Sequence, residues 1–243
     1  MPCHIGTSGW QYAHWKGPFY PGDCLQRNFL DYYATCFSTV EINNSFYKLP
    51  TKKNLCRWTD AVTEDFIFSV KASRYITHMK KLKDPGQSLS GFIKVIDILG
   101  DRAGVVLFQL PPRWHKNTER LKTFLSALPQ HIRYAFEFRD PSWFDDAVYD
   151  MLAVHNAAFC IYDLKGDLSP RPVTTDFVYV RLHGPSESAY QGSYSTRQLT
   201  YWAEKCRQWS DESKDIYCYF DNDQKGFAAK NALTLQAMVN SQK

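Results

Sequence analysis

The chain has 243 residues, a formal net charge of +4, and 44% hydrophobic residues. This length is close to the roughly 250 residues of a single eight-stranded β/α barrel, and the apolar content is sufficient for a sizeable core. The small net charge permits a basic patch but does not require a nucleic-acid partner. No apolar run approaches the roughly 20 residues of a transmembrane helix, so we expect no membrane partner.

The seven cysteines are scattered, without a CxxC pair, and Cys160 and Cys218 lie inside candidate strands. This pattern favours buried, reduced thiols over a disulfide framework. The chain reaches its first candidate strand almost at once, so a signal peptide is not expected. We therefore expect a cytoplasmic protein.

Eight short segments rich in β-branched and aromatic residues recur along the chain and stop at Gly, Pro, Asn or Asp. In order they are CHIGTSGW, TVEINNSFY, FIFSVKAS, GVVLFQLPP, RYAFEFRDPSW, AFCIYDL, FVYVRLHG and IYCYFDND. Helical spacing of apolar residues fills most intervals between them, at residues 25–37, 54–62, 89–99, 117–128, 142–154, 197–209 and 226–239. Ser142 and Thr196 are candidate N-caps for two of these helices.

The alternation of strand and helix predicts a parallel sheet covered by helices. Eight strands favour an α/β fold of the (β/α)8 TIM-like barrel type, and the first strand is not followed by the GxGxxG of a dinucleotide-binding sheet. Residues 164–176 read as a loop, LKGDLSPRPVTTD, so the sixth helix is expected to be irregular or missing. We predict a single domain over residues 1–243, because no linker or low-complexity tract interrupts the pattern.

Charged and amide side chains gather at the carboxyl ends of the predicted strands. Because strand side chains alternate, Arg181 and His183 share one face of their strand, opposite the apolar face that helices would cover. The set expected to point into the barrel mouth by this reasoning is Glu41, Asn43, Lys71, Gln109, Glu137, Arg139, Asp163, Arg181 and His183. The set either binds a ligand, or forms a buried ion-pair network that plugs the barrel.

An excess of cations in a concave site favours a small anionic substrate, phosphorylated or carboxylated. We expect Lys71, Arg139 and Arg181 to bind the anion. Glu41 or Glu137 would act as general base, with His183 as acid–base partner. Further substrate contacts are expected from Trp10, Asn43, Tyr47, Arg74, Gln109, Tyr190, Tyr194, Asn222 and Asp223.

Two features of this expected site stay open. The helix that Gly226 begins offers free N–H groups to an anion, and alternation does not settle whether Asp221 or Asn222 points inward. The aromatic residues at the rim can stack sugars or bases, or can simply pack the long loops. A non-catalytic module for a nucleotide or for single-stranded nucleic acid is therefore an alternative function.

The primary expectation is that no cofactor is bound, and a divalent metal is the main alternative. Glu137, Asp163, His183 and Asp221 offer oxygen and imidazole ligands from successive strand ends. Against this, Arg139 and Arg181 would repel a cation, and no HxH, HxxxH or HExxH motif is present. GxSxG and P-loop motifs are also absent, and a glycosidase pair of Glu41 and Glu137 would need a defined separation.

Nearly the whole chain resembles the YecE-like family, also called the domain of unknown function 72 family. The segments that carry this resemblance are IGTSGW, KGPFYP, VEINNSFY, FSVKASRYITH, QLPP, AFEFRDPSW, DFVYVRLHG and FDNDQKGFAAKNA. The resemblance implies a TIM-barrel-like fold and no settled activity. The family has been likened by fold to endonuclease-IV-type and xylose-isomerase-type barrels, an analogy behind the alternative of a metal-dependent hydrolase or isomerase. Where the family pattern reads FNND, this chain has Asp221 before Asn222, which adds a carboxylate.

Overall fold

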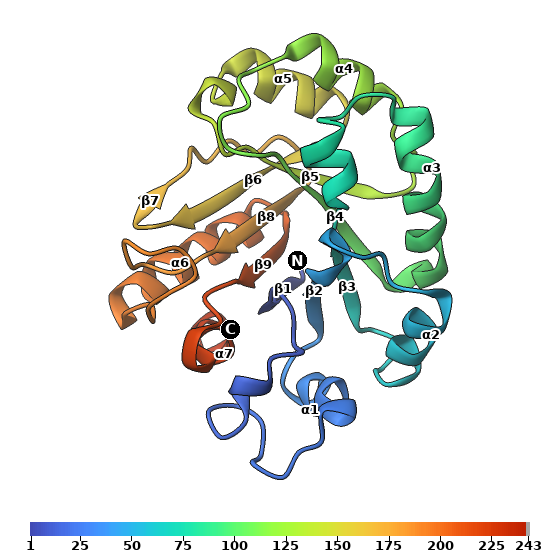
Figure 1. The fold of residues 1–243 in the computed structure, drawn as a ribbon. Helices are drawn as coiled ribbons and strands as arrows, with labels where there is room; N and C mark the ends of the chain where they lie inside the picture. The colour runs from blue at the N-terminus through green and yellow to red at the C-terminus, as the bar shows by residue number, and fades with distance from the viewer. Residues whose placement is uncertain (242–243) are drawn as a thin grey trace.

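The protein, described here by a computed structural model over residues 1–241, is built on eight parallel strands that form a nearly closed barrel (Figure 1). The strands are β1 (Cys3–Thr7), β2 (Thr39–Ile42), β3 (Ile67–Lys71), β4 (Ala103–Gln109), β5 (Arg133–Glu137), β6 (Ala157–Leu164), β8 (Phe177–Leu182) and β9 (Asp215–Phe220). They lie in the order β1-β9-β8-β6-β5-β4-β3-β2. The two end strands meet through a single bridge between Ser8 and Glu41, and the Gly9 N–H donates to the Glu41 carbonyl at 2.8 Å.

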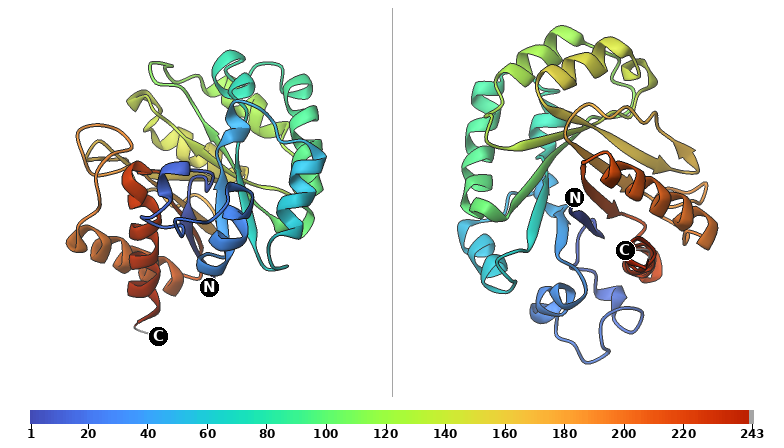
Figure 2. Two further views of the ribbon diagram at one scale, coloured as in Figure 1. Left: turned by 60° about the horizontal axis from the view of Figure 1, so that its bottom comes forward. Right: turned by 180° about the vertical axis from the view of Figure 1, so that it is seen from behind.

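Helices surround the barrel, as Figure 2 shows from two further directions. They are α1 (Phe29–Cys36), α2 (Lys52–Asp60), α3 (Pro85–Ile96), α4 (Thr118–Ser126), α5 (Asp146–Val154), α6 (Thr196–Asp211) and α7 (Phe227–Asn240). This arrangement confirms the predicted TIM-like α/β barrel. None of these helices is both long and apolar enough to cross a membrane, a finding that holds for residues 1–241.

The structure replaces both of the predicted N-cap residues. The side chain of Asp145, not Ser142, caps α5 by accepting from the Ala147 N–H, because residues 141–143 form a separate 3-10 turn. Helix α6 begins one residue earlier than predicted, with Ser195 in a capping box with Gln198. In both cases a second capping residue lies within three positions of the expected one, so the local sequence alone did not choose between them.

The prediction of an irregular or missing sixth helix is confirmed. Between β6 and β8 the chain forms only the short strand β7 (Asp167–Leu168), which pairs antiparallel with the end of β6. In Figure 1 this hairpin extends between α5 and α6, where a covering helix would otherwise lie.

The interior of the barrel is packed with side chains. Small and aromatic residues fill it, including Val105, Leu107, Ala135, Cys160 and Tyr179, all fully buried. The buried Tyr219 hydroxyl joins this layer to the Thr39 and Ser69 hydroxyls at 2.7 and 2.9 Å. A ligand must therefore approach the barrel from one of its two ends, and the carboxyl end is where barrel enzymes act.

Candidate functional site at the carboxyl end of the barrel

Arg181 is the centre of a buried ionic network at the carboxyl end of the barrel. Its Nη2 donates to Glu41 Oε1 at 2.8 Å and to Asp221 Oδ2 at 3.0 Å, and its Nη1 donates to Glu137 Oε2 at 2.9 Å. The side chains of Arg181, Glu41 and Glu137 have no exposed surface. Burial alone would raise the pKa of Glu137, but the Arg139 and Arg181 guanidinium groups hold it well below its usual range. All three carboxylates thus contact one guanidinium, an arrangement that agrees with the plug alternative for this lower layer.

His183 and Asp221 form an oriented pair above Arg181. The His183 Nδ1 lies 3.0 Å from Asp221 Oδ2, and the Nε2 lies 2.9 Å from Nη2 of Arg139. A guanidinium can only donate, so Nε2 accepts and the ring proton is on Nδ1, facing the Asp221 carboxylate. The ring of Tyr190 covers the imidazole edge-on at 5.5 Å. His183 is therefore a neutral imidazole whose Nε2 is occupied by Arg139.

Lys71 is buried at the same level without a carboxylate partner. Within residues 1–241 no carboxylate oxygen comes within 4.0 Å of its ammonium group, which lies 4.6 Å above the Phe46 ring. Burial, and then repulsion from Arg181, lower the pKa of Lys71 to about 8. Lys71 and Arg181 are both buried cations, but only Arg181 is neutralised by direct contacts.

Positive charge extends from Lys71 to the rim of the barrel. His78 belongs to a π-helical turn (Tyr75–Met79), and its ring contacts the Phe46 ring edge-on at 4.9 Å. Burial, and then the charges of Lys71, Arg74 and Arg139, lower the pKa of His78 to about 4. Three cations, two at the end of β3 and one after β5, therefore act on one imidazole. We call Lys71, Arg74, His78 and Arg139 the cationic mouth; π-helical turns of this kind are frequent at functional sites.

Asp163 was expected in the mouth, and the structure places it outside the barrel. Cys160 and Tyr162 point inward on β6, so the next residue points outward. There Asp163 lies beside Tyr194 and a cavity of about 410 Å³ against α6, and burial raises the pKa of this carboxyl to about 6. The alternation of β6 therefore puts the aromatic Tyr162, and not Asp163, on the inner face.

The four predicted metal ligands are consequently not brought together. Among residues 1–241, no group of three or more His, Cys, Asp or Glu side chains is arranged to hold a metal ion. His183, Glu137 and Asp221 do converge, but the guanidinium groups of Arg139 and Arg181 donate to these same atoms.

Of the last-strand residues, Asp221 points into the barrel and Asn222 points out. The Asn222 side chain donates to the Gly192 carbonyl at 2.8 Å and to Asn231 Oδ1 at 2.9 Å. The buried Tyr194 hydroxyl accepts from the Gly184 N–H at 3.0 Å. Asn222 and Tyr194 were expected to contact substrate, but here they hold down the loop that carries Tyr190 over His183.

The start of α7, where the sequence left an anion site open, is closely covered by the first loop. A Cβ on Gly226 would lie 3.0 Å from the Pro18 side chain, which shows how closely the first loop covers this helix end. The Asp223 carbonyl accepts from Trp15 Nε1 at 2.9 Å, and its carboxylate lies 3.6 Å from His14.

The remaining predicted contacts lie around the rim. Trp10, Asn43 and Tyr47 line a cavity of about 320 Å³ beside the network. Gln109 ends β4 and is paired in register with Glu137. Arg74 is exposed next to His78.

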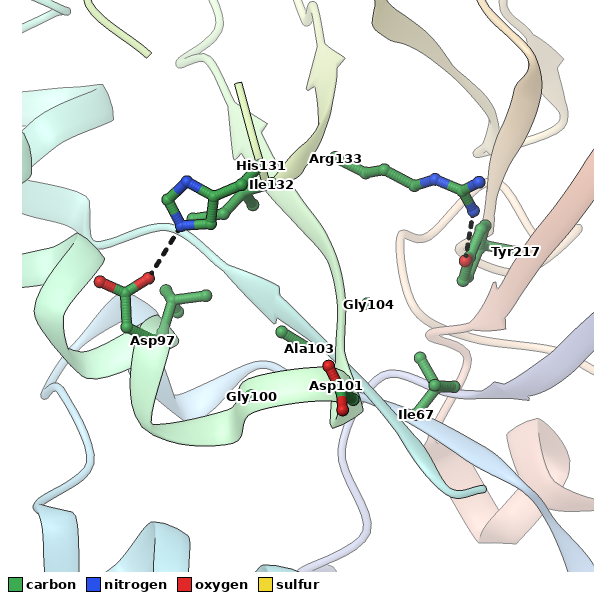
Figure 3. A pocket seen from close by; sticks show the side chains of 11 residues that line it. Ile67, Asp97, Gly100, Asp101, Ala103, Gly104, His131, Ile132, Arg133 and Tyr217 are labelled. Atoms are coloured by element: carbon green, nitrogen blue, oxygen red, sulfur yellow. Dashed lines mark hydrogen bonds and ion pairs between the residues drawn. The ribbon is translucent and has the colours of Figure 1, made fainter. Parts of the chain in front are cut away.

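A cavity of about 540 Å³ opens at the opposite, amino end of the barrel (Figure 3). Figure 3 shows Arg133 reaching Tyr217, whose hydroxyl accepts at 2.9 Å, and His131 facing Asp97 at 3.1 Å. Arg133 also lies 2.9 Å from Asp215. Each of these basic side chains has its own acidic partner, so this cavity lacks the unmatched charge found at the carboxyl end.

Sequence reasoning missed several members of the site. Ser8 donates to Glu41 and accepts from Arg181 Nη2 at 3.1 Å, and the Tyr179 hydroxyl donates to Glu41 Oε2 at 2.7 Å. Tyr179 lies two residues before Arg181, so alternation placed it on the same face and could have identified it. Ser8 lies just beyond β1, and nothing in the sequence marks it as a member of the site. The buried Asn231 is a polar residue within the apolar face of α7, and this interruption can be recognised in the sequence.

Comparisons with known proteins extend over the whole chain. The model of the family described as "Protein of unknown function DUF72" matches residues 4–243. The chain is 25% identical over 269 residues to the UPF0759 protein YunF of Bacillus subtilis, a match that covers 98% of this chain and 94% of YunF. It is 30% identical over 142 residues to the UPF0759 protein YecE of Escherichia coli, covering 58% of this chain and 50% of YecE.

Solved structures have the same fold. A DUF72 family protein from Thermotoga maritima superimposes with a TM-score of 0.89 at 31% identity, covering 98% of this chain and 99% of that one. A DUF72 family protein from Enterococcus faecalis has a TM-score of 0.82 at 20% identity, covering 98% and 95%, and supports the fold alone.

Proposed function

The chain belongs to the DUF72 family, as its motifs predicted, and from the geometry of its barrel mouth we propose that it binds a small phosphorylated or carboxylated ligand there. Lys71, Arg74 and Arg139 would contact the anionic group. The His183–Asp221 pair would exchange a proton with the bound ligand, which makes the protein an enzyme of the hydrolase, lyase or isomerase type.

The observation that carries this proposal is the buried, unmatched ammonium group of Lys71. A buried charge without a partner is costly, and proteins normally pair such a group or replace it. Arg181 is paired with three carboxylates a short distance away, so the chain does not lack acidic groups at this level. Asp221, Glu41 and Glu137 act on Lys71 only from a distance, and an anionic ligand between Lys71 and Arg139 would supply the direct contact that Lys71 lacks.

Proton transfer by His183 would follow from the same binding event. In the free protein Arg139 donates to the His183 Nε2 at 2.9 Å, which blocks that atom. A ligand anion that draws the guanidinium toward itself would release Nε2, while Asp221 keeps the proton on Nδ1. Nε2 would then be free to accept a proton from the ligand.

The sequence predicted that Glu41 or Glu137 acts as the general base. In this proposal the two carboxylates have a different role. Glu41 accepts from Ser8, Tyr179 and Arg181, and Glu137 accepts from Arg139 and Arg181. With their oxygen atoms occupied, these carboxylates serve as counter-charges that position the guanidinium groups. The role of base passes to His183.

Binding of simple anions tests the proposal. Inorganic phosphate and succinate are titrated into the protein by calorimetry, with the imidazole signals followed by NMR. We expect binding that weakens at least tenfold in Lys71→Met and is unchanged in Lys122→Met, which removes an exposed lysine of α4. If neither anion binds and the signals of His78 and His183 do not move, the proposal is wrong.

A further inference from the structure

A cavity of about 320 Å³ lies beside the cationic mouth, and we call it the ring pocket. Its lining side chains are Trp10, Gln11, Tyr12, Asn43, Asn44 and Tyr47. Its volume falls at the lower end of the range for small-molecule sites, which begins at about 300 Å³. The pocket is formed by the segments that directly follow β1 and β2, so it opens at the carboxyl end of the barrel.

Tyr12 forms a fixed wall between the ring pocket and the ionic network. Its hydroxyl donates to the Ser8 carbonyl at 2.6 Å and lies against the Asn43 side chain. Gly9 has a φ of +89°, and a Cβ there would lie 2.8 Å from the Tyr12 hydroxyl, so only glycine permits this approach. Burial, followed by the charges of Asp221 and Asp223, raises the pKa of Tyr12, which shows how near the pocket lies to the acidic groups of the network.

The lining combines aromatic rings with amides. The Tyr47 side chain is 81% exposed, and its ring touches the Phe46 ring only edge-on. An aromatic ring so exposed contributes little to the core, and its face is open to stacking. Trp10, by contrast, is fixed against Trp58 at 5.0 Å. The amides of Gln11, Asn43 and Asn44 each offer both a donor and an acceptor, as the edge of a nucleobase requires.

The Phe46 side chain contacts a member of the ring pocket and a member of the cationic mouth. The Phe46 ring lies 5.0 Å from the Tyr47 ring on one side and 4.6 Å from the Lys71 ammonium group on the other. In a nucleotide, one ribose separates the base from the 5′-phosphate. An aromatic site and an anion site that both border Phe46 are neighbours, as the base and phosphate sites of a nucleotide-binding protein must be.

We propose that the ligand is a nucleoside monophosphate, with its base in the ring pocket against Tyr47 and its phosphate at Lys71 and Arg139. This inference rests on the proposed function, because it takes the cationic mouth as the phosphate site. It adds that the ring pocket supplies affinity for the base and that Tyr47 contributes through its ring.

Calorimetric titration with AMP, ribose 5-phosphate and adenosine tests the two parts separately. We expect AMP to bind at least fivefold more tightly than ribose 5-phosphate, consistent with a stacking contribution of about 1–3 kcal/mol per base. Tyr47→Ala should remove this advantage and leave ribose 5-phosphate binding unchanged. Tyr47→Phe, which keeps the ring, should bind AMP as the unmodified protein does.

The outcomes distinguish this inference from the proposed function. If ribose 5-phosphate binds and AMP binds no more tightly, the ring pocket has no part in recognition and the inference is overturned, while the anion site stands. If Tyr47→Ala weakens AMP and ribose 5-phosphate equally, the inference is also overturned. If none of the phosphate-bearing probes binds, the inference is overturned, and the proposed function then stands or falls with the binding of succinate.

Discussion

The two ends of the barrel each place an arginine among carboxylates, but in different surroundings. At the amino end, Arg133 is 37% exposed and its partner Asp215 is 19% exposed. At the carboxyl end, Arg181 has no exposed surface and is surrounded by three carboxylates, with the unpaired Lys71 beside it. Water can replace the first set of contacts, whereas it reaches the second set only at the margins, through Asp221 and Lys71. The ionic groups that are costly to bury are thus concentrated at the end where a barrel ligand would bind.

Replacement of the two arginines is expected to give the largest contrast. Arg181→Met leaves Glu41 and Glu137 buried without their shared partner, so we expect a loss of about 3–5 kcal/mol in the free energy of unfolding. Arg133→Met removes a partly exposed pair, and we expect a loss of about 1 kcal/mol or less. Urea denaturation of both variants measures the difference. Equal losses would show that the two ends do not differ as burial implies.

Lys71→Met is expected to stabilise the protein while it weakens anion binding. At neutral pH the charged, unmatched ammonium group is destabilising, and its removal should raise the free energy of unfolding by about 1–3 kcal/mol. Lys122→Met, on the exposed face of α4, should change it by less than about 0.5 kcal/mol. A destabilised Lys71→Met variant would mean that Lys71 is part of a structural plug.

The pH dependence of the same pair gives a second readout. The pKa of Lys71 is about 8 in the folded protein, against an ordinary value of 10.5. Between these pH values the unfolded chain binds more protons at Lys71 than the folded protein does. Lys71 therefore makes the free energy of unfolding rise as the pH increases from about 8 to 10.5. Lys71→Met should lack that rise, and Lys122→Met should retain it.

The sequence predicted the barrel and the inward face of most strands, because alternation requires only the order of residues. Arg181, His183, Glu41 and Glu137 were identified in this way. Asp163 was misplaced because an aromatic residue at the end of a strand, Tyr162, can face either side. The sequence could not predict that Arg181 has three carboxylate partners and Lys71 none, because pairing depends on the stagger of the strands around the barrel.

Replacement of His78 is expected to change the free energy of unfolding less than replacement of Lys71. Its folded pKa of about 4 lies below the ordinary 6.5, so the unfolded chain binds more protons between these values, and stability is lost as the pH falls from about 6.5 to 4. His78→Gln should lose less stability than the unmodified protein over this range. NMR titration should also show the pKa of His78 rising when phosphate is bound, because the anion offsets Lys71, Arg74 and Arg139. An unchanged pKa at saturating phosphate would place the anion elsewhere.

The smallest effect is expected from Asp163→Asn, just outside the barrel at the same end. The pKa of this carboxyl is about 6, above the ordinary 3.8, so its charge is destabilising above pH 6, and stability rises as the pH falls from about 6 to 3.8. The amide variant should lose that pH dependence and bind phosphate as the unmodified protein does. Asp221→Asn, the matched change on the inner face, should weaken the orientation of His183 and weaken phosphate binding. If Asp163→Asn instead impairs phosphate binding as strongly as Asp221→Asn, the functional site includes residues on the outer face of the barrel. The distinction between an ionic interior that binds the ligand and an exterior that only supports the fold would then be wrong.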